Sequence, residues 1–169
     1  MKKLCVLLSL LLAWSVPVSA GVLNSRATSV ERLVTDGDGV VLVVEFTLPA
    51  ADRVGRVARG MLEFETPCAA EDEASIWLHA LGEAPTTLSR SWWTSTRDEI
   101  ERGGIWEGEK LPQGPAVVQI NMTRAVRAAL ADGKSTVTVL IRTVDGTCSD
   151  VSATNLADRF QLQMIYRDR

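Results

Sequence analysis

The sequence predicts an all-β fold, a β-sandwich or jelly roll of about seven or eight antiparallel strands with one short helix. The first observation is a series of short segments in which apolar and polar residues alternate. The second is the placement of turn-forming residues between these segments. The third is a single stretch, Thr123 to Asp132, whose apolar residues recur at helical spacing instead.

Strand-like alternation is clearest near the C-terminus. The segment "RFQLQMIYR" carries Phe160, Leu162 and Met164 on one side, with Gln161 and Gln163 on the other. The segments "MLEFE" and "TVTVLIR" alternate in the same way. In "VVLVVEFTL" one side is apolar throughout, whereas the other is apolar at its start and polar at its end. Alternation with period two indicates strands that bury one face.

Turn-forming residues separate these segments. "TDGDG" precedes "VVLVVEF", and Asp-Gly pairs supply the positive φ of a tight hairpin. Five prolines fall outside the alternating segments, where a missing N–H disrupts no strand pairing: Pro49, Pro67, Pro85, Pro112 and Pro115. We therefore expect one domain without internal repeats or linkers.

The predicted helix lies in "INMTRAVRAALADG". Thr123 is the expected N-cap, and Gly133 is expected to end the helix in a left-handed conformation. One face of the helix carries Met122, Val126, Ala129 and Leu130. A helix of roughly two to three turns does not persist in water without packing. This apolar stripe is therefore expected to lie on the sheet or to cover an end of the sandwich.

The segment from Leu81 to Gly114 alternates poorly and contains three tryptophans. Within it, "TSTRDEIERGG" predicts a second short helix, with Ser95 or Thr96 as cap and Gly103 as stop. A connection of this length inside a compact domain is often functional.

The first residues predict export. Lys2 and Lys3 precede an apolar run from Leu4 to Val16, and the small residues "VSA" then form a cleavage site that ends at Ala20. This is the pattern of a secretory signal peptide, residues 1–20, followed by a single domain, residues 21–169. The run is shorter than the roughly 18 residues that a membrane span needs. No other segment is long and apolar enough, so no span is expected after cleavage. The expected location is the periplasm or the extracellular space.

Cleavage would remove Cys5 and leave Cys68 and Cys148. An even pair in an oxidising compartment is most simply one disulfide. That bond would close a loop of about 80 residues and contribute roughly 3–5 kcal/mol in the chain-entropy model. Metal ligation and two free thiols are the alternatives.

Several segments occur in a familiar order: "RVARGMLEFE", "ASIWLHAL", "SRSWWTSTRDEIERGGIW" and "AVVQINMTRAVRAALADGKSTVTVLIR". The order resembles the DNRLRE-type family of secreted, carbohydrate-binding-like β-sandwich modules. The resemblance covers roughly Val54 to Thr143 and is closest from Ile120 to Ile141. It implies a non-catalytic module whose partner is a polysaccharide or an envelope protein. The alternative is a structural or protein-interaction domain of the envelope with no sugar site.

Tryptophans are the residues best suited to a sugar, because flat aromatic faces stack on pyranose rings. Trp92, Trp93 and Trp106 lie in the long connection, and Trp77 and His79 share one side of "SIWLHAL". These five residues form the candidate ligand-binding set. The alternative is that the tryptophans cover the core. Two adjacent tryptophans cannot face one side of a strand, so at least one of the pair is expected to pack inward.

We expect no enzymatic activity and no cofactor. His79 is the single histidine, which rules out a two-histidine metal site. Neighbouring acids such as "DE" (98–99) do not show the opposed carboxylates that general acid–base catalysis needs. "DGD" (36–38) and "DGTCSD" (145–150) offer oxygen ligands for structural calcium, although tight turns explain them equally well. A net charge of −3 argues against nucleic acid as a partner.

Overall fold

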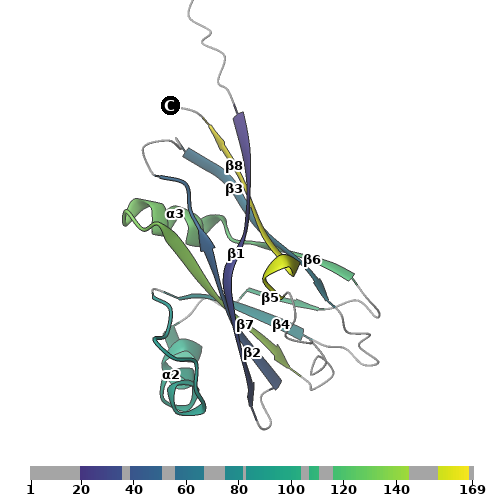
Figure 1. The fold of residues 1–169 in the computed structure, drawn as a ribbon, viewed down its shortest axis with the longest axis vertical. Coiled ribbons are helices and arrows are strands. Elements are labelled where there is room, and N and C mark those ends of the chain that lie inside the picture. Colours follow the sequence, from purple (N-terminus) through teal and green to yellow (C-terminus); the bar gives the residue numbers. More distant parts are fainter. Residues whose placement is uncertain are drawn as a thin grey trace, which may run out of the picture.

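The computed structural model describes residues 20–35, 39–50, 56–66, 75–81, 83–103, 107–110, 116–144 and 156–167. The elements within them are β1 (Ala20–Thr35), β2 (Gly39–Thr47), β3 (Arg56–Thr66), β4 (Ser75–Leu81), α2 (Arg90–Gly103), β5 (Glu107–Lys110), β6 (Ala116–Asn121), α3 (Thr123–Ala131), β7 (Thr136–Val144), the short 3-10 helix η1 (Leu156–Arg159) and β8 (Phe160–Arg167). The strands pair antiparallel in the order β5-β4-β7-β2-β1-β8-β3-β6 (Figure 1). The predicted all-β class is confirmed.

β1 connects two sheets, because its two halves pair with different strands. Residues 20–26 pair with β8, whereas residues 27–35 pair with β2. We call β1-β8-β3-β6 sheet A and β1-β2-β7-β4-β5 sheet B. Where β1 changes partner, a side chain supplements the backbone pairing. Ser25 Oγ donates a hydrogen bond to the carbonyl of Thr47 at 2.9 Å.

The strand order is that of a jelly roll. From β2 to β8, consecutive strands lie in opposite sheets, except β4 and β5, which pair with each other. Eight strands in two sheets with this alternation form the double-sheet jelly roll. The strand count and the architecture therefore agree with the sequence prediction.

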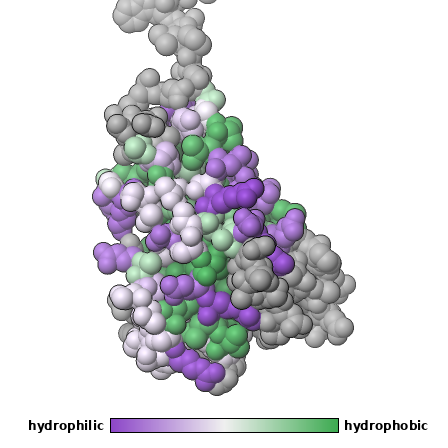
Figure 2. Space-filling view, in the orientation of Figure 1, coloured by the Kyte–Doolittle hydropathy of each residue, from purple (hydrophilic) through white to green (hydrophobic). Residues whose placement is uncertain are grey.

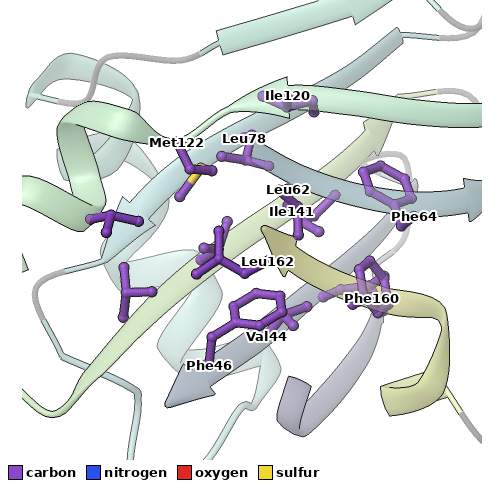
Figure 3. Close-up of a cluster of buried hydrophobic side chains, with 14 of the residues drawn as sticks. Val44, Phe46, Leu62, Phe64, Leu78, Ile120, Met122, Ile141, Phe160 and Leu162 are labelled. Atoms are coloured by element: carbon purple, nitrogen blue, oxygen red, sulfur yellow. The ribbon is translucent and has the colours of Figure 1, made fainter. Parts of the chain in front are cut away.

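The hydrophobic core fills the space between the two sheets, as Figure 3 shows. The residues buried there are those that alternate in the sequence, with Phe46, Leu62, Leu162 and Met164 each 0% exposed. The rings of Phe64 and Phe160, at paired positions of β3 and β8, have centroids 5.3 Å apart. Period-two patterning therefore identified the inner faces of both sheets.

β2 is buried on both of its faces. Val44 and Phe46 point into the core between the sheets, whereas Val41 packs with the residues of α2 on the other side of sheet B. A strand that is apolar on both sides is covered on both sides. The second apolar side of "VVLVVEF" therefore indicates that an additional element covers sheet B.

α3 confirms the predicted helix; it spans Thr123–Ala131, and Asp132 is its C-cap. Val126 and Ala129 are buried, and the helix packs on β3. Gly133 has a φ of 70°, and its N–H donates to the carbonyl of Leu130 at 3.1 Å. The N–H of Lys134 reaches back to the carbonyl of Ala129 at 2.9 Å. These two bonds form a Schellman motif, the left-handed ending that the sequence predicted.

The predicted N-cap at Thr123 is wrong. The N-cap position is Met122, and Thr123 is the first helical residue. Its N–H donates to Oδ1 of Asn121 at 3.0 Å, so a side-chain oxygen just before the N-cap satisfies one of the first N–H groups of the helix. The Thr123 hydroxyl instead accepts the N–H of Gly60 in β3 at 2.9 Å. A Cβ at Gly60 would lie 3.3 Å from Cγ2 of Val126, so a larger residue there would require this side chain to shift by a few tenths of an ångström.

Replacing Gly133 by alanine tests the helix ending. We expect Gly133→Ala to lower the free energy of unfolding by about 1 kcal/mol, because alanine is strained at positive φ. No atom lies within 4 Å of the Cβ position, so backbone strain alone should set the cost. Urea denaturation measures it. Gly133→Asn is the control and should lose less, since asparagine tolerates this conformation. An alanine variant as stable as the parent would contradict the prediction.

Several sequence predictions lie outside the described residues. These are the signal peptide up to residue 19, the three cysteines, Trp106 and both turns considered for calcium. Among the described residues, no helix combines the length and apolarity of a membrane span. The same part of the chain has no group of three or more His, Cys, Asp or Glu residues placed to hold a metal ion.

Candidate functional site

Four of the five candidate ligand-binding residues lie in sheet B or in the helix that covers it. Trp77 and His79 belong to β4, and Trp92 and Trp93 belong to α2. Trp106 lies outside the described residues, and so does the side chain of Trp77. The sequence grouped these five residues by their chemical type alone. The structure places four of them in or on sheet B.

The pairing of β4 with β7 links these residues to α2. Trp77 is opposite Arg142, and His79, which is half-buried, is opposite Leu140. Leu140 is buried beneath α2, and the guanidinium carbon of Arg142 lies 5.9 Å from the centre of the Trp93 ring. At that distance the cation interacts with the face of the indole ring.

A second hydrophobic cluster holds α2 on the outer side of sheet B. We call it the α2 cluster; its buried members are Val41, Trp93, Ile100 and Leu140, with Leu33, Leu81 and Trp92 packed around them. A hydrogen bond to a side chain also fixes the approach to the helix, since the N–H of Leu88 donates to Oε2 of Glu31 in β1 at 3.2 Å. The helix is therefore an integral layer of the fold.

α2 begins earlier than the sequence predicted. It ends at Gly103 as expected, but it starts at Arg90. The N–H of Trp92 donates to Oγ of Ser89 at 3.2 Å, so Ser89 is the capping residue. Ser95, one of the two predicted caps, lies inside the helix, where its hydroxyl donates to the carbonyl of Trp92 at 2.9 Å. Both tryptophans are thus helical.

The adjacent tryptophans differ in burial. Trp93 is 3% exposed, and among the described residues its indole N–H has no hydrogen-bond partner. Trp92 is half-buried at the margin of the α2 cluster. The expectation that at least one of the pair packs inward is met by Trp93. A buried ring with a cation on its face has no surface left for a sugar, so Trp92 is the better placed of the two.

The outer side of sheet A carries rows of polar side chains that were not among the predicted site residues. Strand pairing aligns Asn24 of β1 with Gln163 of β8, then Met61 of β3 and Asn121 of β6. The next row runs Arg26, Gln161, Glu63 and Gln119. We call the five amide residues of these rows the amide face: Asn24, Gln119, Asn121, Gln161 and Gln163.

The amide face is accessible and partly ordered by its own contacts. Four of its five members are exposed, and Gln161 is half-buried. Nε2 of Gln119 donates to Oε2 of Glu63 at 2.7 Å, which fixes the orientation of that amide. The polar side of "RFQLQMIYR" and the alternation in "VVQIN" were the available signals. These residues form one surface only because strand pairing brings together strands that are far apart in the sequence.

The same outer side of sheet A ends in a group of arginines. Arg56 of β3 is directly opposite Arg167 of β8, and Arg59 is opposite Ile165. All three arginines are exposed. We call Arg56, Arg59 and Arg167 the arginine end. Like charges directly opposite each other on neighbouring strands destabilise a sheet.

Removing one of the opposed charges should therefore stabilise the protein. We expect Arg56→Gln to raise the free energy of unfolding by about 0.2–1 kcal/mol, the range for a cross-strand pair. Chemical denaturation at low salt measures the gain, which should shrink as salt screens the repulsion. Arg124→Gln, at an exposed position of α3, is the control and should have little effect. A loss of stability in Arg56→Gln would show that the charge is favourable where it stands.

Comparisons with known proteins show no family for this chain. No family model matches the chain, and no curated protein matches it. Among solved structures, a chain of the tomato aspermy virus X-ray structure is similar at a TM-score of 0.41 and 13% identity, covering 99% of this chain and 94% of that one. The resemblance to DNRLRE-type modules stays a prediction from sequence.

Proposed function

We propose that this chain is an exported, non-catalytic jelly-roll module that binds carbohydrate on the amide face of sheet A. The observation that carries the proposal is the alignment of Asn24 with Gln163 across β1 and β8, within an exposed row of amides. Amide groups both donate and accept hydrogen bonds, as sugar hydroxyls do. The outer face of sheet A presents them along neighbouring strands, where an extended polymer could contact several at once.

The apolar part of such a site comes from the same rows. Met61 is half-buried between Gln163 and Asn121, and Ile165 is half-buried one row further along. Ligand sites combine apolar surface with a few oriented polar groups. The sequence hypothesis instead placed the apolar surface of the site on tryptophans. Of the tryptophans whose side chains the structure describes, Trp92 is the one that could still supply it, at an alternative site on α2.

Export is proposed from the first 20 residues. The predicted cleavage follows Ala20, and β1 begins at that residue. Cleavage there would leave residues 21–35 of β1 in the mature chain and would remove only Ala20 from the residues that pair with β8. The proposed location is the periplasm or the extracellular space.

The second candidate function is a structural or protein-interaction domain of the envelope without a sugar site. The burial of Trp93 beneath α2 favours it, because that tryptophan contributes to packing rather than to a binding platform. In this case the amide face would only keep the outer side of sheet A soluble.

A glycan array and sedimentation with insoluble polysaccharides test the two functions. We expect Asn24→Ala/Gln163→Ala to weaken binding of the retained glycan by about tenfold, from the loss of roughly 0.5–1.5 kcal/mol per hydrogen bond. Ser91→Ala/Thr94→Ala, at exposed positions of α2, is the matched control and should bind normally. If Trp92→Ala alone abolishes binding, the site lies at α2 instead. If the wild-type protein retains no glycan, the carbohydrate proposal fails and the second candidate stands.

A further inference from the structure

The arginine end lies where both ends of the described chain meet. Ala20, the first residue of β1, pairs with Arg167 in the last position of β8, and Arg167 pairs with Arg56 at the start of β3. Figure 1 shows these three strand ends together at one tip of the molecule. Three exposed arginines are therefore concentrated at a projecting end of sheet A.

The positive charge at this tip is not balanced by acidic side chains of the described residues. None of the salt bridges found among those residues includes Arg56, Arg59 or Arg167. Arg127 of α3 adds a fourth cation close by, bonded to the carbonyls of Val57 and Ala58 at 2.7 and 3.2 Å. Neutral carbonyls leave its charge in place.

The sequence next to the tip leaves this balance unchanged. Segment 51–55 contains one arginine and one aspartate, and so does segment 168–169. The chain as a whole has a net charge of −3. Two of these arginines are opposite each other, which lowers the stability of the sheet. A positive group of this kind in an acidic protein is therefore better explained by binding to an anionic partner.

An exposed apolar side chain lies among these arginines. Val22 is 60% exposed and is paired with Ile165, which is in turn paired with Arg59. On the face shown in Figure 2, hydrophobic and hydrophilic residues are interspersed among the described residues. Among the described residues, three large hydrophobic side chains are exposed: Val22, Val34 and Val117.

We propose that the arginine end docks on a membrane surface rich in anionic phospholipid. The guanidinium groups of Arg56, Arg59 and Arg167 bind lipid phosphates, for which arginine offers paired N–H donors. Val22 enters the interface between headgroups and acyl chains. Because attraction decays within a Debye length of about 10 Å, the tip dominates over the acidic remainder of the molecule.

Val22 decides between a lipid surface and an acidic polysaccharide. Both offer anions to the arginines, but a polysaccharide offers no apolar phase for an exposed valine. The docking site adjoins the amide face on the same side of sheet A, with Ile165 at the boundary between them, and it stands whether or not that face binds a glycan.

Vesicle sedimentation tests the docking site. The protein is expressed from the whole coding sequence, exported and purified as processed. It is mixed with vesicles of phosphatidylcholine alone or of phosphatidylcholine with phosphatidylglycerol. We expect binding to the anionic vesicles only, decreasing with added salt. Each arginine near an anionic surface contributes about fivefold, so Arg56→Gln/Arg59→Gln/Arg167→Gln should lower the partition coefficient on the order of 100-fold.

Matched variants control for net charge and for hydrophobicity. Arg26→Gln/Arg90→Gln/Arg159→Gln removes the same charge elsewhere and should keep most of the binding. Val22→Ser should weaken binding by roughly threefold to tenfold, whereas Val117→Ser, at a valine that is 57% exposed on β6, should not. Thermal unfolding confirms that each variant is folded.

Three results would overturn the proposal. The first is equal binding to neutral and anionic vesicles. The second is equal loss in the two triple variants. The third is binding to a soluble polyuronate but not to anionic vesicles, with Val22→Ser unchanged, which would assign the arginine end to an acidic polysaccharide.

Discussion

Trp93→Ala is expected to lower the free energy of unfolding by about 3–5 kcal/mol, the range for removal of a large buried aromatic side chain. Trp93 is 3% exposed and is the largest of the buried residues of the α2 cluster. Its loss leaves a cavity between α2 and sheet B and removes the ring that Arg142 faces. Urea denaturation followed by circular dichroism measures the change.

Two variants show what the indole contributes. Trp92→Ala should cost about 1–2 kcal/mol, because a half-buried side chain transfers less surface from water. Trp93→Phe should restore much of the loss, since the indole N–H has no acceptor among the described residues to leave unpaired. Equal effects of Trp92→Ala and Trp93→Ala would contradict the inferred difference in their packing. A small effect of Trp93→Ala would show that α2 is dispensable for stability.

Reduction of the proposed disulfide between Cys68 and Cys148 is expected to cost about 3–5 kcal/mol in the chain-entropy model. Both cysteines lie outside the described residues, but the strands before them end on the same side of the fold. Cys68 follows Thr66, the end of β3, by two residues, and Cys148 follows Val144, the end of β7, by four. Ser75, where the chain re-enters sheet B after Cys68, pairs with Val144.

Thiol titration of the denatured, unreduced protein tests the bond and the processing together. No titratable thiol is expected, because Cys5 would be lost with the signal peptide and the other two cysteines would be joined. One thiol would mean that the bond forms while Cys5 is retained. Two or more thiols would contradict the disulfide. Cys68→Ser, Cys148→Ser and the double variant should lose similar stability, since each removes the same bond.

The strands and α3 were predictable because their patterns are local. Alternation in "RFQLQMIYR" depends on neighbouring residues only, and so does the left-handed ending at Gly133. The N-cap was misplaced because the contact that fixes Thr123 comes from Gly60 in β3. Local preference predicts that the Thr123 hydroxyl caps its own helix, but in the structure this hydroxyl accepts a hydrogen bond from a distant strand.

The candidate site was harder to predict because it depends on which strands are neighbours. Trp92 and Trp93 are equivalent in type, and only the packing of α2 on sheet B separates them. The same limit applies to Arg56 and Arg167, which are far apart in the sequence and opposite in the sheet. One signal was present but unused: the apolar second side of β2 indicated a covering element, and the long connection was the segment available to supply it.

The division of β1 between two sheets has a consequence for the order of folding. Its first half pairs only with β8 among the described strands, so sheet A is incomplete until β8 has been synthesised. Contacts between such distant segments slow folding, because a long loop must close before they form. If the chain is exported as proposed, this delay would leave it unfolded for longer before transport.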